Sequence, residues 1–338
     1  LGYKPAEEDK ETYHWQMPGF IAREGQHIQS PENYNTITAK YLVYKHKKDP
    51  MLIAVSPATP AATGLTQDMR EKLGKNYVDV GIAEQDAVGF VSGLAANGAK
   101  PVLEVMSSFI QRSYDQLSQD LAINNSPATI LVFGGGISSA DVTHLQIFDI
   151  PLISNIPNIV YLAPTNKEEY IKMLDWSVNQ KEHPVAIRVP TGKVISTGKP
   201  DKTNYSNLNK FKVQISGEKV AIIGVGNFYH LGKEVQQKLK EETGINATLI
   251  NPVYLTGVDE KVLNDLKKNH TLVITLEDGC LDGGYGEKIS RFYSNSDMKV
   301  LNFGAKKEFT DRTPLKELQQ RYHLTPELII QDIKNNLK

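Results

Sequence analysis

The chain has 338 residues, of which 40% are hydrophobic and 23% charged, values that are typical of folded globular domains and not of disordered tails. Its 38 Lys and Arg residues balance 39 Asp and Glu residues, so no positive field exists to hold nucleic acid or an anionic membrane. The single cysteine, Cys280, excludes an internal disulfide and a cysteine-based zinc site. No apolar run approaches the roughly 20 residues of a membrane helix. We therefore expect a cytoplasmic protein that binds neither nucleic acid nor membrane.

The first part of the chain changes character near residue 36. Residues 1–35 are polar without a sustained period, and we expect an extended lead-in there. Farther on, short apolar runs predict strands, and apolar residues at helical spacing predict helices. Thr165 and Glu168 have the spacing of a capping box. The expected strands are 52–55, 77–82, 101–106, 128–132, 159–162 and 185–189, and the expected helices are 84–97, 109–123 and 169–179.

Residues 193–217 lose this pattern and are predicted to link two domains. Beyond them the expected strands are 220–224, 247–250, 272–276 and 299–302, and the expected helices lie near 229–242, 259–268, 284–294, 314–321 and 325–336. Strands that alternate with helices favour a parallel sheet covered on both faces. The sequence thus predicts an α/β protein of two tandem doubly wound domains with mainly parallel sheets, over residues 36–192 and 218–338.

Glu84 is the most informative single residue. The expected strand 77–82 runs directly into the helix that Glu84 begins. A ligand bound beyond the carboxyl end of a parallel strand would meet a side chain at this point. On position alone, a first-turn Glu that interacts with the helix dipole is the simpler interpretation.

Two motifs carry a resemblance to a known family. Residues 82–85 (IAEQ) and 107–116 (SSFIQRSYDQ) resemble the pyrimidine-binding domain of the 1-deoxy-D-xylulose 5-phosphate synthases, which are transketolase-like thiamine diphosphate enzymes of isoprenoid biosynthesis. Residues 2–9 (GYKPAEED) with His14 resemble the segment that joins the first two domains of those enzymes. Residues 218–338 resemble their C-terminal domain, so the similarity covers nearly the whole chain.

The resemblance implies a role for each motif residue. Glu84 would hydrogen-bond the aminopyrimidine ring of thiamine diphosphate and favour the imino tautomer, whose nitrogen accepts the proton of the thiazolium carbon. Phe109 matches the aromatic that stacks on the pyrimidine, although a core phenylalanine is the alternative. Arg112 matches another motif position near the cofactor, and a helix-surface ion pair is the alternative.

The resemblance also implies substrate-side residues. His14 and His144 match histidines of the family's active site, and Asp141 matches an acid that approaches the substrate. A surface histidine is the alternative for His14. The spacing in residues 140–144 (ADVTH) is one residue tighter than in the family, so polar loop capping is the alternative for Asp141 and His144. The implied reaction decarboxylates pyruvate and transfers the resulting ketol unit to an aldehyde, in a homodimer whose sites form between two chains.

Two family arginines that hold the phosphate of the acceptor are absent. The corresponding stretches here are 133–136 (FGGG) and 189–192 (VPTG). Each Arg–phosphate contact is worth roughly 1.5–3 kcal/mol. Three explanations remain open at this point: Lys193 supplies a charge, the glycines 134–136 offer backbone N–H groups to the anion, or the acceptor carries no phosphate.

The sequence contains no Gly-Asp-Gly motif, with which the superfamily holds Mg²⁺ and the cofactor's diphosphate. We therefore expect no metal site in this chain. Because the sequence also begins at Leu1, we expect a diphosphate domain to be missing upstream or to reside in a partner subunit. Such a fragment would be inactive alone. The alternatives are the β subunit of a split transketolase or of a 2-oxo acid dehydrogenase E1 component, and a non-catalytic dimerisation or regulatory relative.

Overall fold

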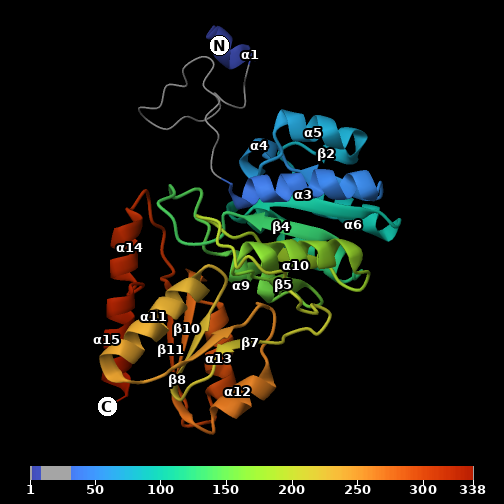
Figure 1. The fold of residues 1–338 in the computed structure, drawn as a ribbon. Helices are drawn as coiled ribbons and strands as arrows, with labels where there is room; N and C mark the ends of the chain where they lie inside the picture. Colours follow the sequence, from blue (N-terminus) through green and yellow to red (C-terminus); the bar gives the residue numbers. More distant parts are fainter. Residues whose placement is uncertain (1, 9–31, 338) are drawn as a thin grey trace.

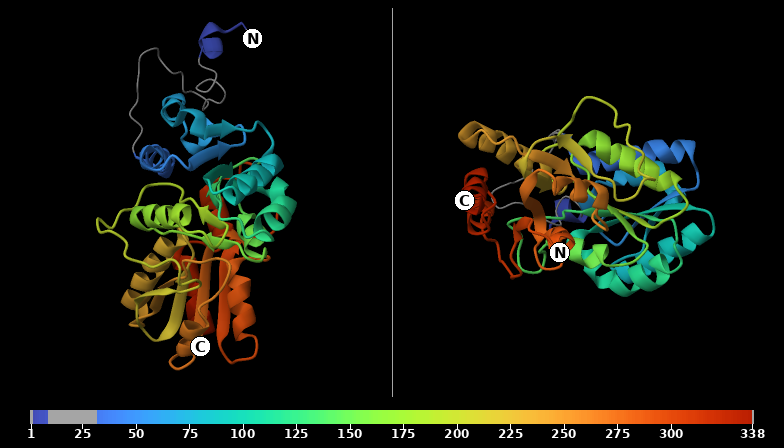
Figure 2. Two further views of the ribbon diagram at one scale, coloured as in Figure 1. Left: turned by 90° about the vertical axis from the view of Figure 1, so that its right-hand side faces the viewer. Right: turned by 90° about the horizontal axis from the view of Figure 1, so that it is seen from below.

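The computed structural model describes residues 2–8 and 32–337, which form two α/β domains one above the other (Figure 1). The left view of Figure 2 shows the first domain, coloured blue to green, above the yellow-to-red second domain. Helix α1, Lys4–Glu8, precedes the first domain. Residues 4–8 are therefore helical, which corrects the expectation of an extended lead-in there. His14 lies outside the described residues.

The first domain is built on a wholly parallel sheet, as its alternating sequence predicts. Its strand order is β2-β1-β3-β4-β6-β5. Most residues of the four strands β1, β3, β4 and β6 are buried, because helices cover both faces. The strands are β1 Leu52–Ser56, β2 Tyr77–Asp79, β3 Lys100–Met106, β4 Thr129–Phe133, β5 Val160–Leu162 and β6 Val185–Arg188.

The helices of this domain lie on the two faces of the sheet. One face packs against α6 and α9, and the other against α3, α5 and α10. The helices are α3 Tyr34–Lys48, α4 Pro60–Thr63, α5 Gln67–Leu73, α6 Glu84–Ala96, α7 Ser107–Ile110, α8 Tyr114–Gln116, α9 Asp149–Ser154 and α10 Lys167–Asn179. A single 3-10 turn, η1 Gly74–Asn76, connects α5 to β2.

The continuous helix expected over 109–123 is wrong. The segment consists instead of α7, the 3-10 turn η2 Gln111–Ser113, α8 and the π turn η3 Leu117–Ala122. Leu117 and Leu121 in the π turn are both fully buried. Because a four-residue spacing also fits an α-helix, the apolar pattern alone does not reveal the break.

The capping box expected ahead of α10 is also wrong, by one residue. Asn166 caps the helix, and its side-chain oxygen accepts the N–H of Glu169 at 3.0 Å. The Glu169 carboxylate in turn accepts from the N–H and the hydroxyl of Thr165, both at 2.9 Å. Glu168 instead accepts hydrogen bonds from Ser196 and Thr197 in the segment that leaves the domain.

The second domain has a mainly parallel sheet with the strand order β11-β10-β8-β9-β7. Its edge strand β7 runs antiparallel to β9 and lies inside the range predicted as linker. The strands are β7 Lys212–Ile215, β8 Lys219–Gly224, β9 Thr248–Asn251, β10 His270–Cys280 and β11 Lys299–Ala305. The helices are α11 Phe228–Thr243, α12 Glu260–Leu266, α13 Tyr285–Tyr293, α14 Leu315–Arg321 and α15 Pro326–Asn336. They again cover both faces of the sheet.

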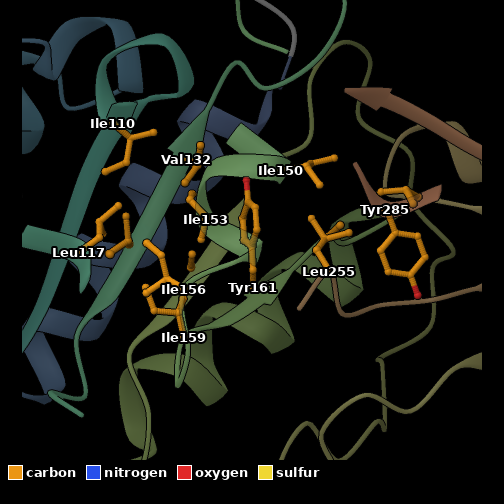
Figure 3. Close-up of a cluster of buried hydrophobic side chains, with 14 of the residues drawn as sticks. Ile110, Leu117, Val132, Ile150, Ile153, Ile156, Ile159, Tyr161, Leu255 and Tyr285 are labelled. Atoms are coloured by element: carbon orange, nitrogen blue, oxygen red, sulfur yellow. The ribbon is translucent and has the colours of Figure 1, made fainter. Parts of the chain in front are cut away.

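One continuous hydrophobic cluster spans both domains. Buried side chains of the first domain, including Val132, Ile150 and Tyr161, belong to the same cluster as Leu255 and Tyr285 of the second (Figure 3). Backbone hydrogen bonds cross at the same place: the N–H of Leu255 donates to Tyr161 at 2.8 Å. The relative position of the domains is therefore set by apolar burial and by backbone pairing together.

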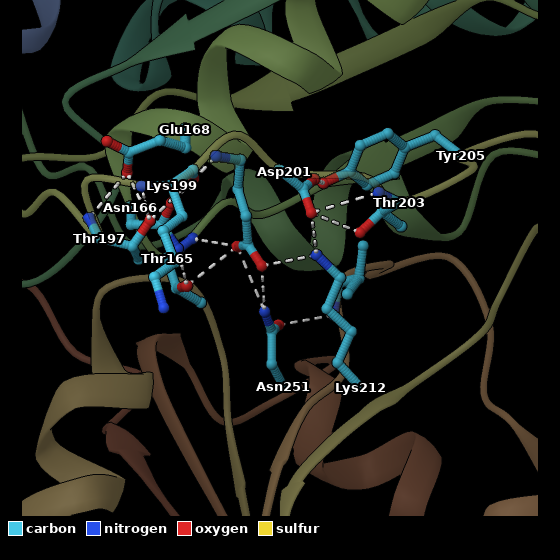
Figure 4. A network of polar contacts seen from close by, with 12 residues as sticks. Thr165, Asn166, Glu168, Thr197, Lys199, Asp201, Thr203, Tyr205, Lys212 and Asn251 are labelled. Atoms are coloured by element: carbon cyan, nitrogen blue, oxygen red, sulfur yellow. Dashed lines mark hydrogen bonds and ion pairs between the residues drawn. The ribbon is translucent and has the colours of Figure 1, made fainter.

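A polar network reinforces this junction (Figure 4). Lys212, on the edge strand β7, lies 2.7 Å from Glu169 and 3.4 Å from Asp201. Asn251 at the end of β9 donates to Glu169 at 3.2 Å. Because Glu169 is almost fully buried, these donors compensate the desolvation of its carboxylate. Within residues 2–8 and 32–337, every helix is too short or too polar to cross a membrane.

Candidate active site

Glu84 begins α6 just beyond the carboxyl end of β2. The turn before it is fixed by Asp79, whose carboxylate accepts the N–H of Gly81 at 2.9 Å and that of Ala58 at 3.0 Å. Gly81 has φ +74°, a conformation that favours glycine. The turn therefore delivers Glu84 to the carboxyl edge of the sheet, where parallel α/β domains bind their ligands.

The Glu84 carboxylate is buried but incompletely satisfied. The residue is 3% exposed, and Oε2 has no hydrogen-bond partner among the described residues. The nearest cation is Arg112, whose Nη1 lies 3.2 Å from Oε2 as an ion pair. A buried carboxylate oxygen without a hydrogen bond is costly unless a ligand supplies one. Because Glu84 also lies at the carboxyl edge of the sheet, its unpartnered oxygen marks a candidate binding site there.

Phe109 and Arg112 lie in the interrupted helical segment that follows β3. Phe109 lies in α7 and Arg112 in the following turn η2. The ring of Phe109 is half-buried and meets the His144 ring edge-on, with centroids 5.6 Å apart and an interplanar angle of 66°. Phe109 therefore contacts the loop that carries His144, and Arg112, three residues later in the chain, contacts Glu84.

Asp141 organises that loop. Its Oδ1 accepts hydrogen bonds from the hydroxyl of Thr143 at 2.6 Å and from its N–H at 3.0 Å, and it lies 3.0 Å from Nδ1 of His144. The Thr143 hydroxyl and then His144 hold the pKa of Asp141 well below its usual range. The loop capping that the sequence left as an alternative is therefore present, and it orients His144, whose side chain is half-exposed.

Arg312 of the second domain contacts this loop. Its N–H donates to the carbonyl of Ala140 at 2.9 Å, and its guanidinium lies 4.0 Å from Asp141. Sequence reasoning missed this residue, since it lies in an irregular segment without a recognisable motif. The contact means that both domains contribute to the surroundings of Asp141 and His144.

A buried ion cluster connects the two domains. Arg188, at the end of β6, donates to Asp149 at 2.6 Å and pairs with Asp278 of the second domain. Tyr161 donates its hydroxyl to the same carboxylate of Asp149 at 2.6 Å. All four side chains are almost fully buried. The cluster therefore links β6 and α9 of the first domain to β10 of the second.

Arg188 was also missed, although the sequence carries a signal for it. A charged residue ends an otherwise apolar strand, and a guanidinium in that position needs carboxylate partners in order to be buried. The two partners lie 39 and 90 residues away in the sequence, so only the need for a partner could have been predicted.

The glycines 134–136 make room for this cluster. A Cβ on Gly135 would lie 2.7 Å from Nε of Arg188, and one on Gly136 would lie 2.5 Å from the Asp278 carboxylate. The N–H of Gly136 donates to the carbonyl of Gln146 at 2.7 Å. That N–H is therefore occupied, which corrects the hypothesis that all three glycines offer free N–H groups to an anion.

Lys193 makes no hydrogen bond or ion pair with the other described site residues. It lines a cleft of about 290 Å³ between the domains, together with Thr191, Asn227, His230 and Asp278. Asn227 donates to the hydroxyl of Thr191 at 2.8 Å across the cleft. The structure thus joins Glu84 to Arg112 and joins Phe109 to His144 and Asp141, while Lys193 makes no ion pair with any described residue. No cluster of three or more His, Cys, Asp or Glu side chains suited to a metal occurs in the described part of the chain.

Comparison with known proteins identifies the class. The profile of the family "Transketolase, pyrimidine binding domain" matches residues 33–195, and that of "Transketolase, C-terminal domain" matches residues 209–329. The chain belongs to the transketolase-like thiamine diphosphate enzyme family, of which it contains these two domains.

The similar curated proteins are more specific. The chain is 33% identical to the 1-deoxy-D-xylulose-5-phosphate synthase of Crocosphaera subtropica over 98% of this chain and 53% of that protein. It is 36% identical to the synthase of Clostridium perfringens over 86% of this chain and 47% of that protein. The chain thus spans about half the length of the curated relatives it matches.

Solved structures show the same fold. A split-gene transketolase, described as an inactive β4 tetramer, superposes with a TM-score of 0.77 at 20% identity and covers 90% of this chain and 98% of its own. A transketolase of Pichia stipitis superposes with a TM-score of 0.69 at 16% identity and covers 91% of this chain and 48% of its own.

Proposed function

We propose that the chain forms the pyrimidine-binding half of a thiamine-diphosphate-dependent transferase, in which Glu84 handles the proton of the cofactor's pyrimidine ring. The observation that carries the proposal is the buried Glu84 carboxylate, whose Oε2 has no hydrogen-bond partner among the described residues. A ring nitrogen of a bound cofactor would supply the missing partner.

The residues around Glu84 fit this group. Arg112 holds the carboxylate in place from one side without making a hydrogen bond to it. Phe109, which precedes Arg112 by three residues and meets the ring of His144, would offer an aromatic surface to a planar ring. Thiamine diphosphate, when bound, supplies the electron sink for breaking and forming bonds next to a carbonyl carbon. The protein's part is to bind and orient the ring, to hold the proton at Glu84 and to exclude water.

On the substrate side, we propose pyruvate as the donor and an aldehyde as the acceptor, by analogy with the named activity of the curated relatives. His144 would contact the substrate, positioned by Asp141 and by the edge of Phe109. Thr191 and the glycines stand where the family carries phosphate-binding arginines. We therefore propose an acceptor whose phosphate contributes less to binding, with Lys193 as the nearest candidate cation in the inter-domain cleft.

The diphosphate and Mg²⁺ would be bound by the half of the relatives that this chain does not match. That half would be either fused to the chain or a separate subunit, and the whole would assemble as a dimer of such units. The likeness to a split-gene transketolase subunit, which covers nearly that whole chain, favours a separate subunit as the second candidate arrangement.

The test measures carbon dioxide release from pyruvate with thiamine diphosphate and Mg²⁺, in the complex of this chain with the diphosphate-binding half. Glu84→Gln removes the proton while keeping the size of the side chain, and we expect a loss of about 10²–10⁴-fold. Asp86→Asn, in the same helical turn but exposed, is the matched control and should retain activity. Undiminished turnover in Glu84→Gln would refute the proton role, and no turnover in the unsubstituted complex would favour a non-catalytic relative.

A further inference from the structure

A second hollow lies between the domains and shares no lining residue with the Glu84 site or with the Lys193 cleft. Its volume is about 640 Å³. The end of α9 contributes Ser154 and Asn155, and the segment between the domains contributes Asn209. The remaining wall comes from residues 256–260 and from α13. An adjoining hollow of about 410 Å³ shares four of these residues and extends the space.

Two neighbouring cations line this hollow without a carboxylate partner. Lys288 and Arg291 lie three residues apart on α13, and neither side chain has an ion pair or hydrogen bond with any described residue. Like charges at this spacing destabilise a helix by roughly 0.2–0.5 kcal/mol. Burial, and then the repulsion of Arg291, lower the pKa of Lys288, although Glu277 and Glu287 act in the opposite direction.

The rest of the lining is largely neutral. Glu260 is its one carboxylate, so with Lys288 and Arg291 the lining carries a net charge of +1. Asn209 packs against the bare backbone of Gly257, where a Cβ would lie 2.5 Å from its amide. Thr256 lies beside it. An amide and a hydroxyl that face a space beside two cations suit a ligand that carries both an anion and hydroxyl groups.

We propose that this hollow binds a small organic phosphate, with the phosphate between Lys288 and Arg291 and the hydroxylated part against Asn209 and Thr256. The Arg291 guanidinium supplies the forked donor that matches phosphate oxygens, and Lys288 supplies a compact second charge. Since the lining residues come from both domains, the ligand would bridge them, and none of the lining residues is a proposed catalytic residue. The site is therefore a candidate for an effector and is independent of the proposed function.

The test is isothermal titration calorimetry of the purified full chain with glycerol 3-phosphate, in the absence of thiamine diphosphate and pyruvate. We expect saturable binding with one ligand per chain. The double variant Lys288→Gln/Arg291→Gln should weaken it at least tenfold. The matched control Lys233→Gln/Lys316→Gln removes two exposed lysines elsewhere and should change the affinity less than twofold. Circular dichroism of each variant verifies folding.

Two further variants test which part of the ligand each residue recognises and whether the site is separate from Glu84. Asn209→Ala should weaken glycerol 3-phosphate several-fold while leaving inorganic phosphate unchanged, because only the former carries hydroxyl groups. Glu84→Gln should bind normally, which separates this site from the catalytic proposal. Equal affinity in the Lys288/Arg291 variant and the control would overturn the proposal, as would the absence of binding at millimolar glycerol 3-phosphate.

Discussion

Glu104 is a buried acid in the middle of β3, and its replacement by Gln gives the sharpest test of the described packing. The residue is fully buried. Thr63 donates its hydroxyl to Oε2 at 2.5 Å, and Oε1 has no partner among the described residues. Burial raises the pKa of Glu104 from 4.5 to about 8, while Thr63 acts in the opposite direction. The nearby Tyr170 is neutral and hydrogen-bonded to Thr38, so it offers no compensating charge.

The consequence for stability follows from proton linkage. The folded chain keeps the Glu104 proton up to about pH 8, whereas the unfolded chain loses it near pH 4.5. The stabilising effect of this proton is thus complete below pH 4.5, falls as the pH rises, and is lost above pH 8. Because each tenfold change in proton affinity is worth about 1.4 kcal/mol, the total is about 5 kcal/mol.

Glu104→Gln is neutral at every pH and keeps an acceptor for Thr63. Relative to the unsubstituted chain, the variant should therefore gain about 4 kcal/mol in free energy of unfolding between pH 5 and pH 9. Urea denaturation at pH 5, 7 and 9 measures this difference, with the exposed Glu317→Gln as control. Glu277, whose pKa burial raises to about 7, titrates in both proteins and cancels. A difference that stays constant with pH would show that Glu104 is not buried as described.

Three other substitutions test the junction and the cleft, and a fourth, Gly93→Ala, serves as a comparison. Arg188→Met leaves Asp149 and Asp278 as unpaired buried charges and should lower the free energy of unfolding by about 3–5 kcal/mol, measured by urea denaturation. Gly136→Ala, at φ +128° and against Asp278, should cost about 1–3 kcal/mol in the same assay, whereas Gly93→Ala, in a helix with open space around it, should stabilise by roughly 1 kcal/mol. Thr191→Arg should lower the KM for a phosphorylated aldehyde about tenfold or more in the reconstituted enzyme, with no change for an unphosphorylated one. An unaltered ratio of the two KM values would place the acceptor elsewhere than the Thr191 cleft.

The alternating pattern of the sequence was sufficient to predict the fold class, because each buried parallel strand and each amphipathic helix leaves its own period. The edge strand β7 was not predicted, because it forms only by pairing with β9, which is distant in the sequence. Its partly exposed residues have the polar character expected of a linker. The break after Phe109 was missed for a related reason, since a π turn preserves apolar spacing on average. The α10 cap differed by one residue because Asn166 competes with Thr165 for the same role.

For the candidate site, the sequence placed Glu84 at a strand tip, and the contact with Arg112 spans 28 residues that no local pattern connects. The loop contacts of Asp141 were within reach, as Asp and Thr two residues apart commonly form such a turn. The roles of Glu84, Phe109, Arg112 and His144 remain predictions that the proposed experiments address. The surroundings of Lys193 and the partners of Arg188 could not be predicted from the sequence, because they depend on how the two domains pack against each other.

The hydrophobic cluster that contains both Tyr161 and Leu255 spans the two domains, and this has a consequence for how the protein unfolds. Severing the two domains would expose a large apolar face on each, so neither half should persist as a soluble, well-ordered piece. Thermal melting should therefore proceed in one cooperative step. A chimera that takes its second domain from a relative would need complementary residues on both sides of this domain interface. For the same reason, a flexible hinge introduced at the interface would be poorly tolerated.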